Sequence, residues 1–291
     1  MSYRFELRDV SLTESLRRIA RAELAPITTH LGQPDLAPAT VHDIRKRVKK
    51  TRALLRLVRQ GMRDVQAGEN VILRDAARAL AGQRDGAVRL ATFDRLMAGE
   101  SGAATLALRA HLAAEAAMPA PPPPDLHAVF ADLALRLESW QVEGGERRIL
   151  AAGLAETRAR AREAMRTARD APTDEALHDW RKRAKDHWYQ ARLFAPVWPE
   201  MMRPVVTEAD RLGEALGDHH DLAVLLAHVA ALPEDVARPE ARELLAAAVR
   251  DAQTAIESSA FALGARLFAG NPEEMADLWL KWWKIWRAQI G

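Results

Sequence analysis

The segment Val41–Arg59, with the sequence VHDIRKRVKKTRALLRLVR, predicts an amphipathic helix that carries an unusual concentration of positive charge. It contains eight Lys and Arg residues and one acidic residue, whereas the whole chain of 291 residues has 42 basic and 40 acidic ones. Positions three or four apart form one row that is apolar except for Thr51: Val41, Ile44, Val48, Thr51, Leu55, Val58 and Met62. This spacing indicates a helix with one side in a core.

A row of basic residues follows the same spacing, one position later. After His42 this first basic row contains Arg45, Lys49, Arg52, Arg56, Arg59 and Arg63, and it is widened by Lys46, Arg47 and Lys50. It lies about 100° around the helix from the apolar row, because a helix has 3.6 residues per turn. One interpretation is a solvated face balanced by acids of neighbouring helices. The other interpretation is an anion-binding surface. A face with charges of one sign favours this interpretation, because a face that serves only solubility would mix both signs.

The same pattern occurs again 136 residues later. The segment LHDWRKRAKDHWYQARLFA begins at Leu177, and its second basic row contains His178, Arg181, Lys185, Trp188 and Arg192, widened by Lys182 and Arg183. The same offset aligns LAGQRDGAVRLATF from Leu80 with LGDHHDLAVLLAHV from Leu216, so that Arg84–Asp85 falls on His220–Asp221. This repeat predicts a duplicated helical unit.

The spacing of apolar residues predicts an all-α fold, because no segment alternates with the period of a strand. We expect helices at 11–29, 40–64, 70–97, 102–117, 126–141, 146–169, 174–194, 203–231, 238–268 and 273–289. The proline-rich MPAPPPPD, Met118–Asp125, cannot continue a helix and reads as a stiff linker. We therefore divide the chain into a first bundle (1–118), a linker (119–125) and a second bundle (126–291) that ends in a Trp-rich helix.

The starts of the two basic helices carry capping signals. Thr40 followed by Asp43 has the form of a capping box, and Thr173 precedes Asp174 and Glu175 in the second copy. The first turn of a helix favours an anion. The start of the second copy is the more acidic, so the two ends need not bind equally.

Composition excludes several classes of protein. The chain has no Cys, which rules out disulfides and thiolate metal sites and fits a reducing cytoplasm. Its longest apolar run is too short to span a bilayer.

In DHHD, Asp218–Asp221, adjacent His residues point to different helix faces, so we expect no metal site there, and no cofactor elsewhere. The C-terminal LWLKWWKIW is predicted to pack on the second bundle; a membrane-surface or protein-partner patch is the alternative.

The two basic segments resemble the CHAD family, the conserved histidine α-helical domain. The shared pattern is His, two residues, Arg-Lys, two residues, Lys. It occurs as His42, Arg45, Lys46 and Lys49, and again as His178, Arg181, Lys182 and Lys185. The family also has Arg-Asp followed by an apolar residue in the next helix. Arg84–Asp85 with Val88 matches that feature, whereas His220–Asp221 matches it in part because His replaces Arg.

The resemblance implies two four-helix bundles related by a pseudo-two-fold axis. It also implies binding of inorganic polyphosphate along a basic groove or pore between them, in the cytoplasm and on polyphosphate granules. The binding residues expected from it and from the rows are His42, Arg45, Lys46, Lys49, Arg52, Arg56, Arg84, His178, Arg181, Lys182, Lys185, Arg192 and His220. The departures Trp188 and His220 predict a weaker second half-site.

Two other functions remain open from the sequence. Basic helices also suit the phosphodiester backbone of DNA or RNA, although stacking aromatics are sparse near the first row and no helix-turn-helix or zinc-finger pattern occurs. An enzyme acting on polyphosphate or triphosphates needs a phosphate-cradling glycine loop or carboxylates that hold Mg²⁺. The chain has no Gly-x-x-x-x-Gly-Lys-Ser/Thr and no Glu-x-Glu-x-Lys. We therefore expect binding without catalysis.

Overall fold

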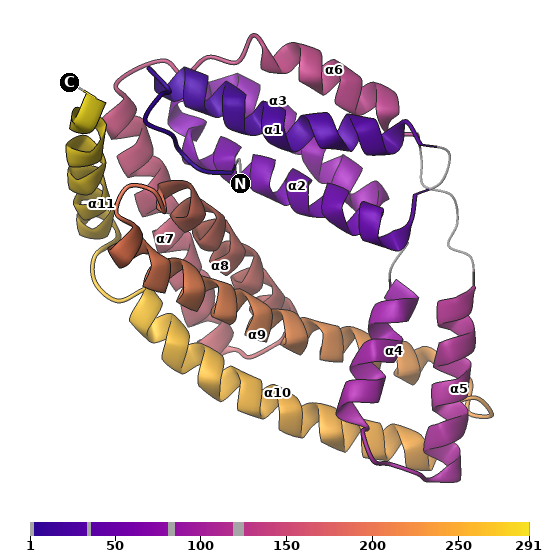
Figure 1. Ribbon diagram of the computed structural model, residues 1–291. Helices are drawn as coiled ribbons and strands as arrows, with labels where there is room; N and C mark the ends of the chain where they lie inside the picture. Colours follow the sequence, from indigo (N-terminus) through magenta and orange to yellow (C-terminus); the bar gives the residue numbers. More distant parts are fainter. Residues whose placement is uncertain (1–2, 34–35, 81–84, 119–124, 291) are drawn as a thin grey trace.

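A computed structural model describes residues 3–33, 36–80, 85–118 and 125–290 (Figure 1). Helices joined by short connections make up these ranges, and no strand occurs in them, which confirms the predicted all-α class. In chain order the helices are α1 (Leu12–Leu31), α2 (Pro38–Leu57), α3 (Arg59–Ala79), α4 (Asp85–Leu96), α5 (Ala103–Ala117), α6 (His127–Leu137), α7 (Glu146–Asp170), α8 (Asp174–Phe194), α9 (Pro199–Ala231), α10 (Pro239–Leu267) and α11 (Pro272–Arg287).

Most predicted helices appear within a few residues of their expected bounds, but the region 40–97 differs. It forms three helices rather than two, with breaks after α2 at Val58 and after α3 at Leu80. The break expected between residues 64 and 70 is misplaced: Gly68 and Asn70 lie inside α3, and the backbone is instead non-helical at Arg63, with φ 40° and ψ −117°. A single glycine is tolerated in a helix whose other residues pack, so glycine by itself does not locate a helix end.

The two expected caps have different outcomes. The Thr173 hydroxyl accepts a hydrogen bond from the amide of Ala176, as predicted. The capping box at Thr40 is wrong, because α2 already begins at Pro38, and its N-cap residue, Ala37, makes no side-chain cap. Proline suits the first helical position because its φ is already helical and its missing N–H needs no partner there.

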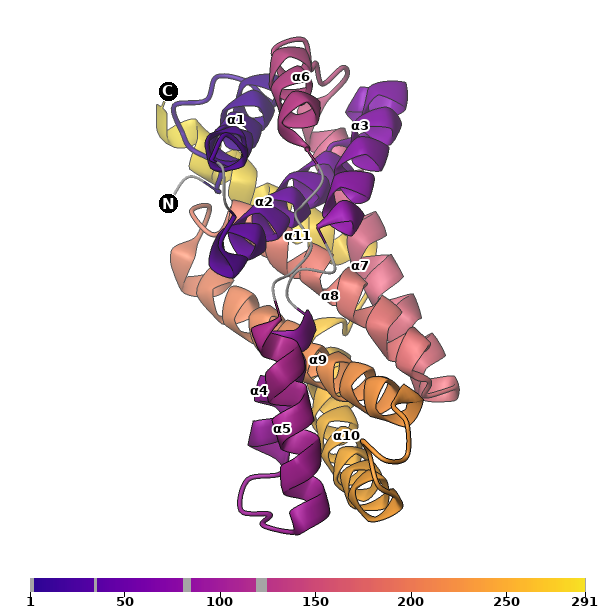
Figure 2. The same ribbon diagram turned by 90° about the vertical axis from the view of Figure 1, so that its right-hand side faces the viewer.

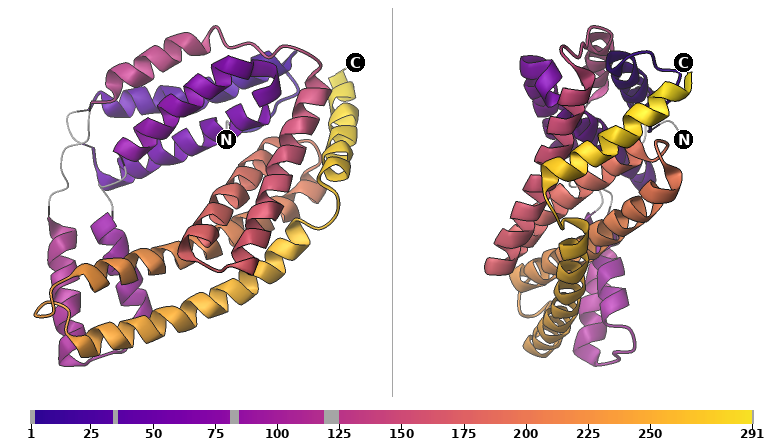
Figure 3. Two further views of the ribbon diagram at one scale, coloured as in Figure 1. Left: turned by 180° about the vertical axis from the view of Figure 1, so that it is seen from behind. Right: turned by 90° about the vertical axis from the view of Figure 1, so that its left-hand side faces the viewer.

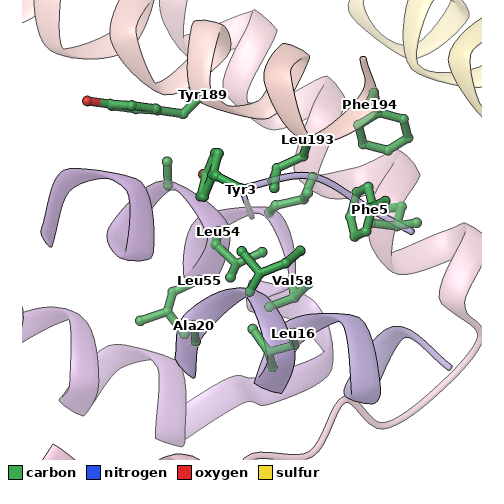
Figure 4. Packing of buried hydrophobic residues seen from close by; sticks show 14 of the residues in the cluster. Tyr3, Phe5, Leu16, Ala20, Leu54, Leu55, Val58, Tyr189, Leu193 and Phe194 are labelled. Atoms are coloured by element: carbon green, nitrogen blue, oxygen red, sulfur yellow. The ribbon is translucent and has the colours of Figure 1, made fainter. Parts of the chain in front are cut away.

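Helices from both halves of the chain share the largest core. This core takes side chains from α1, α2, α3, α6, α7, α8, α9 and α11, together with Tyr3 and Phe5 of the N-terminal segment. Figure 4 shows Tyr3 and Phe5 between Leu54 of α2 and Phe194 of α8. The Phe5 amide donates to the Leu193 carbonyl oxygen at 3.0 Å, which ties the segment to the end of α8.

The hairpin of α4 and α5 packs far from α1–α3, on the outer ends of α9 and α10 (Figures 1 and 2). A separate core forms there, with Phe93 and Leu108 from the hairpin and Leu225 and Leu245 from the long helices. Conversely, α6 follows the proline-rich segment yet packs on α1. Packing therefore crosses the predicted boundary at 119–125, of which residues 119–124 lie outside the described ranges.

The C-terminal helix α11 lies along α7 at the edge of the molecule (Figure 3). Trp279, Trp283 and Trp286 are buried in the largest core. Trp283 contacts the Phe5 ring edge-on, with ring centroids 4.7 Å apart. These contacts confirm that the tryptophan stripe packs on the protein.

Two pairs of helices begin at positions that are separated by the offset of the sequence repeat. Pro38 of α2 and Asp174 of α8 lie 136 residues apart, as do Ala103 of α5 and Pro239 of α10. The single helix α9 covers the positions that correspond to parts of α3 and α4. The duplication itself stays a prediction from sequence.

Candidate anion-binding site

The first basic row lies on α2 as far as Arg56, whereas Arg59 and Arg63 belong to α3, beyond the break at Val58. The four sides of α2 have different neighbours. The apolar row is buried, with Ile44 and Val48 fully inaccessible. Toward α3, Arg45 donates to the Ala77 carbonyl oxygen at 3.3 Å, and Arg52 Nε donates to Asn70 Oδ1 at 3.0 Å. The solvent side of the helix carries the exposed residues His42, Lys46 and Lys49. The helix therefore presents cations on more than one side.

The side of α2 that faces α1 is neutralised by acids. Buried Glu23 of α1 lies 3.0 Å from Lys50 Nζ and 3.4 Å from Arg47 Nη1, and Asp43 lies 2.6 Å from Arg47 Nε. Part of the charge in Val41–Arg59 is thus balanced within the protein. Arg47 and Lys50, expected to widen the first basic row, belong to this balanced side.

Neighbouring charges and burial perturb Arg52. Burial, with Arg56 close by, lowers the pKa of the Arg52 guanidinium to about 10. Asp186 acts in the opposite direction on this pKa, and Asn70 accepts the Arg52 hydrogen bond, so Arg52 is a partly desolvated cation held against α3 and close to α8.

The second basic row lies on α8, and acids pair with two of its lysines. Lys185 Nζ is 3.1 Å from Asp210 of α9 and 4.2 Å from the centre of the Trp188 ring. Lys182 Nζ is 3.3 Å from Asp179, although the Lys182 side chain remains 53% exposed. Arg181 and Lys185 lie directly over glycines of α9, at Gly217 and Gly213, which leave room for them.

Trp188 replaces an arginine of the first row and forms an aromatic platform. Lys185 and Arg192 both lie over its ring, with the Arg192 Cζ 4.9 Å from the centroid. Arg192 also approaches the Tyr3 ring, at 5.7 Å. An aromatic face attracts such cations and holds them in place without neutralising them. The substitution therefore reduces the number of charges in the row but orders two that remain.

His178 and His220 form a stacked pair between α8 and α9. Their ring centroids are 3.9 Å apart and the planes are inclined by 26°. Burial, with His220 and Lys182 nearby, lowers the pKa of His178 to about 4, and burial also lowers the pKa of His220. Both rings are therefore neutral at pH 7. Within the described ranges, the buried His178 Nδ1 has no hydrogen-bond partner.

The Asp of the partly matching second motif, Asp221, follows His220 in α9. Burial raises the pKa of the Asp221 carboxyl, and the positive charge of Arg181 opposes that rise. Arg84 lies outside the described residues, so the corresponding pair in the first copy has no structural description. Asp218–Asp221 gathers no metal-binding cluster in the described ranges. Instead His219 Nε2 lies 3.0 Å from Glu257 Oε1, and His220 turns to His178.

The two basic helices meet where Arg56 of α2 approaches Asp186 of α8, at 2.6 Å. A small pocket beside this ion pair is also lined by Arg59, Arg160 and Arg183. From this contact the N-terminal parts of α2 and α8 diverge (Figure 1). The structure thus joins the two rows at one end and separates the two His-containing ends.

Sequence reasoning missed the acids that balance the rows. Glu23 falls in the apolar spacing of α1, between Ile19 and Ile27, and an acid in such a position signals a buried cation partner. Asp186 occupies the position of Lys50 in the repeat alignment, so the sequence shows that an acid replaces a base there. The sequence does not show that Arg56 is the partner of Asp186, because this ion pair joins α2 to α8 across 130 residues.

A family model described as the CHAD domain matches residues 18–230, which include α2, α8 and most of α9. The chain belongs to the CHAD family. This CHAD protein is similar in fold to the crystal structure of the CHAD domain from the plant Ricinus communis, with a TM-score of 0.59 and 18% sequence identity. The match covers 97% of this chain and 95% of that chain. Comparison with curated proteins yields no significant match.

A helix that spans a bilayer must be both long and apolar. No helix of this CHAD protein within the described ranges meets both conditions. This agrees with the absence of a predicted membrane span.

Proposed function

We propose that this CHAD protein binds inorganic polyphosphate without hydrolysing it, through the basic rows of α2 and α8. The observation that carries the proposal is the matched exposure of cations on both helices. Lys46 and its counterpart Lys182 are both exposed, 136 residues apart in the repeat, on helices that contact each other. Solubility requires only charged residues of mixed sign, so it does not explain why a row of one sign is repeated.

The chemistry of the ligand fits such a surface. Polyphosphate carries about one negative charge per phosphate and presents only oxygen atoms, which Lys and Arg recognise by charge-assisted hydrogen bonds. His42, His178 and His220 can donate or accept hydrogen bonds at the ends of the rows. Affinity should come largely from release of counterions, and it should therefore fall steeply with salt.

The carboxylates near the basic rows are engaged in ion pairs, which favours a non-catalytic role. Asp186 and Asp210 are held by Arg56 and Lys185. A carboxylate engaged in this way must lose its partner before it can hold Mg²⁺. We expect no phosphate release from polyphosphate or nucleoside triphosphates with Mg²⁺ or Mn²⁺. Turnover that disappears in Asp221→Asn would show that the protein is an enzyme.

The location that follows from the proposal is the cytoplasm, with recruitment to polyphosphate granules. A fluorescent fusion should colocalise with granules in cells that accumulate polyphosphate, and should become diffuse when the basic rows are reversed in charge. Colocalisation that survives charge reversal would contradict recruitment by these rows.

Binding is tested by titration with long-chain polyphosphate at several salt concentrations. Lys46→Glu/Lys182→Glu should lower the affinity at least about tenfold and reduce the slope of log K against log salt by about two. The matched control is Lys281→Glu/Lys284→Glu, the same charge change at exposed positions of α11. Equal loss in both variants would refute a localised site. Competition with DNA at one salt concentration distinguishes polyphosphate from a nucleic-acid backbone.

A further inference from the structure

Arg158 of α7 and His187 of α8 form a second group of buried polar side chains, apart from the basic rows. Only 6% of Arg158 and 2% of His187 is exposed. Both line a small pocket whose other walls are apolar or belong to the first turns of α11, among them Leu154, Pro272 and Trp279. The pocket therefore lies where α11 is attached to α7 and α8.

Arg158 is a buried cation without a carboxylate partner among the described residues. Its Nη2 donates to the Ala269 carbonyl oxygen at 2.6 Å, and its Cζ lies 6.0 Å from the centre of the Phe268 ring. Its buried Nε has no hydrogen-bond partner in the part of the chain that the structure describes. Burial, with Arg162 nearby, lowers the pKa of Arg158. A desolvated charge in this state destabilises the protein unless something negative approaches it.

His187 brings a second unsatisfied atom to the same pocket. Its ring packs against the rings of Phe268 and Trp279, with centroids 5.4 Å and 5.9 Å away. The buried His187 Nε2 has no hydrogen-bond partner among the described residues. Burial and the charge of Arg158 lower the pKa of His187 to about 3, so the ring is neutral at pH 7. A neutral imidazole can still carry its proton on Nε2 and donate it.

The pocket admits one small particle. Its cavity volume is about 10 Å³, which gives room for a single water or a monatomic ion. Pro272, at the start of α11, forms part of the wall. The amides of Glu273 and Glu274 that follow it already donate to Asn271 Oδ1, so the positive charge at the pocket is that of Arg158. Size and charge therefore agree on a small anion.

We propose that a halide-sized monovalent anion, such as chloride, binds between Arg158 and His187. The anion accepts hydrogen bonds from Arg158 Nε and His187 Nε2 and neutralises the buried guanidinium. It thereby joins α7 and α8 to the turn at Ala269 and to the first turn of α11. This site is independent of polyphosphate binding, because none of its residues belongs to the basic rows.

A crystal structure of the full chain grown or soaked in sodium bromide tests the site directly. The expected result is an anomalous difference peak at the bromine absorption edge within about 3.5 Å of both nitrogen atoms. Electron density in the pocket without an anomalous peak would identify a buried water and would overturn the proposal.

Thermal unfolding provides a second test in solution. At equal ionic strength, bromide should raise the midpoint of the wild type by about 2–4 °C relative to gluconate, whose anion is too large for the pocket. Arg158→Met should lose this rise. Arg162→Met is the matched control, because Arg162 donates to the neighbouring Gly270 carbonyl oxygen but is exposed. An equal bromide effect in all three proteins would reflect general salt action and would contradict the site.

Discussion

Arg56 belongs to the first basic row and also joins α2 to α8 through its ion pair with Asp186. Asp186, its partner, is largely buried, and burial raises the pKa of this carboxyl while Arg56 lowers it. A buried ion pair contributes little net stability compared with apolar residues, whereas the loss of one partner leaves an uncompensated charge. Removal of one partner and removal of both should therefore have different effects on stability, which distinguishes the ion pair from a general effect of charge.

We predict that Arg56→Leu lowers the free energy of unfolding by about 3 kcal/mol. The double variant Arg56→Leu/Asp186→Leu should be closer to the wild type, because it removes both charges. Urea unfolding of the wild type, both single variants and the double variant gives the coupling energy. Additive effects would show that the ion pair has no special role at the contact of α2 with α8.

The stacked pair His178–His220 makes stability depend on pH. The unfolded chain takes up a proton near the ordinary pKa of histidine, about 6.5. Folded His178 does so only near 4. Because the unfolded state binds more protons between these values, the free energy of unfolding should fall as the pH drops from 6.5 toward 4.

His178→Asn should reduce the loss of stability between pH 7.5 and pH 5, measured by thermal unfolding. His127 is exposed at the start of α6, and His127→Asn serves as the control. Buried His187 has a lowered pKa and acts with the same sign, so the variant should keep part of the pH dependence. An unchanged pH dependence in His178→Asn would contradict the assignment.

At the scale of helices, close packing depends on small residues at crossings. Gly153 of α7 meets the backbone of α2, where an added Cβ would lie 2.0 Å from the Leu57 carbonyl oxygen. A backbone atom cannot rotate away as a flexible side chain can. The crossing of α7 with α2 therefore requires glycine at this position.

Gly153→Ala should lower the free energy of unfolding by about 3 kcal/mol or more, because the helices must separate. Gly68→Ala in α3 is the matched control. Its Cβ would meet nothing within 4 Å. It should stabilise the protein by up to about 1 kcal/mol through helix propensity alone. Denaturant unfolding compares the two variants, and similar effects would refute the close crossing.

At the scale of the whole molecule, the contact between α2 and α8 joins the two basic rows. A long polyanion that engages both rows makes its second contact almost intramolecularly, with a gain of about 10²-fold or more over one row. A very short chain can occupy one row and gains nothing from the second. Chain length is therefore the variable that distinguishes one continuous surface from two sites.

Lys49→Glu/Arg52→Glu should weaken binding of long polyphosphate far more than binding of very short chains. Lys182→Glu/Lys185→Glu should act in the same direction but less strongly, because Asp179 and Asp210 already balance part of that row. Affinities over a series of chain lengths give the measurement, and circular dichroism confirms that each variant remains helical. Equal losses for long and short chains in both variants would show two separate sites.

The sequence by itself determined the helical class, most helix positions and the two rows on α2 and α8. These features depend on spacing along one helix, which a sequence displays directly. Only the tertiary structure decided which cations are balanced. Glu23, Asp186 and Asp210 reach their partners from other helices. It also decided that α4 and α5 pack on α9 and α10, and that Arg158 lies buried beside His187. Such contacts join residues far apart in the chain, and their energies depend on burial and distance, which no spacing along a single helix encodes.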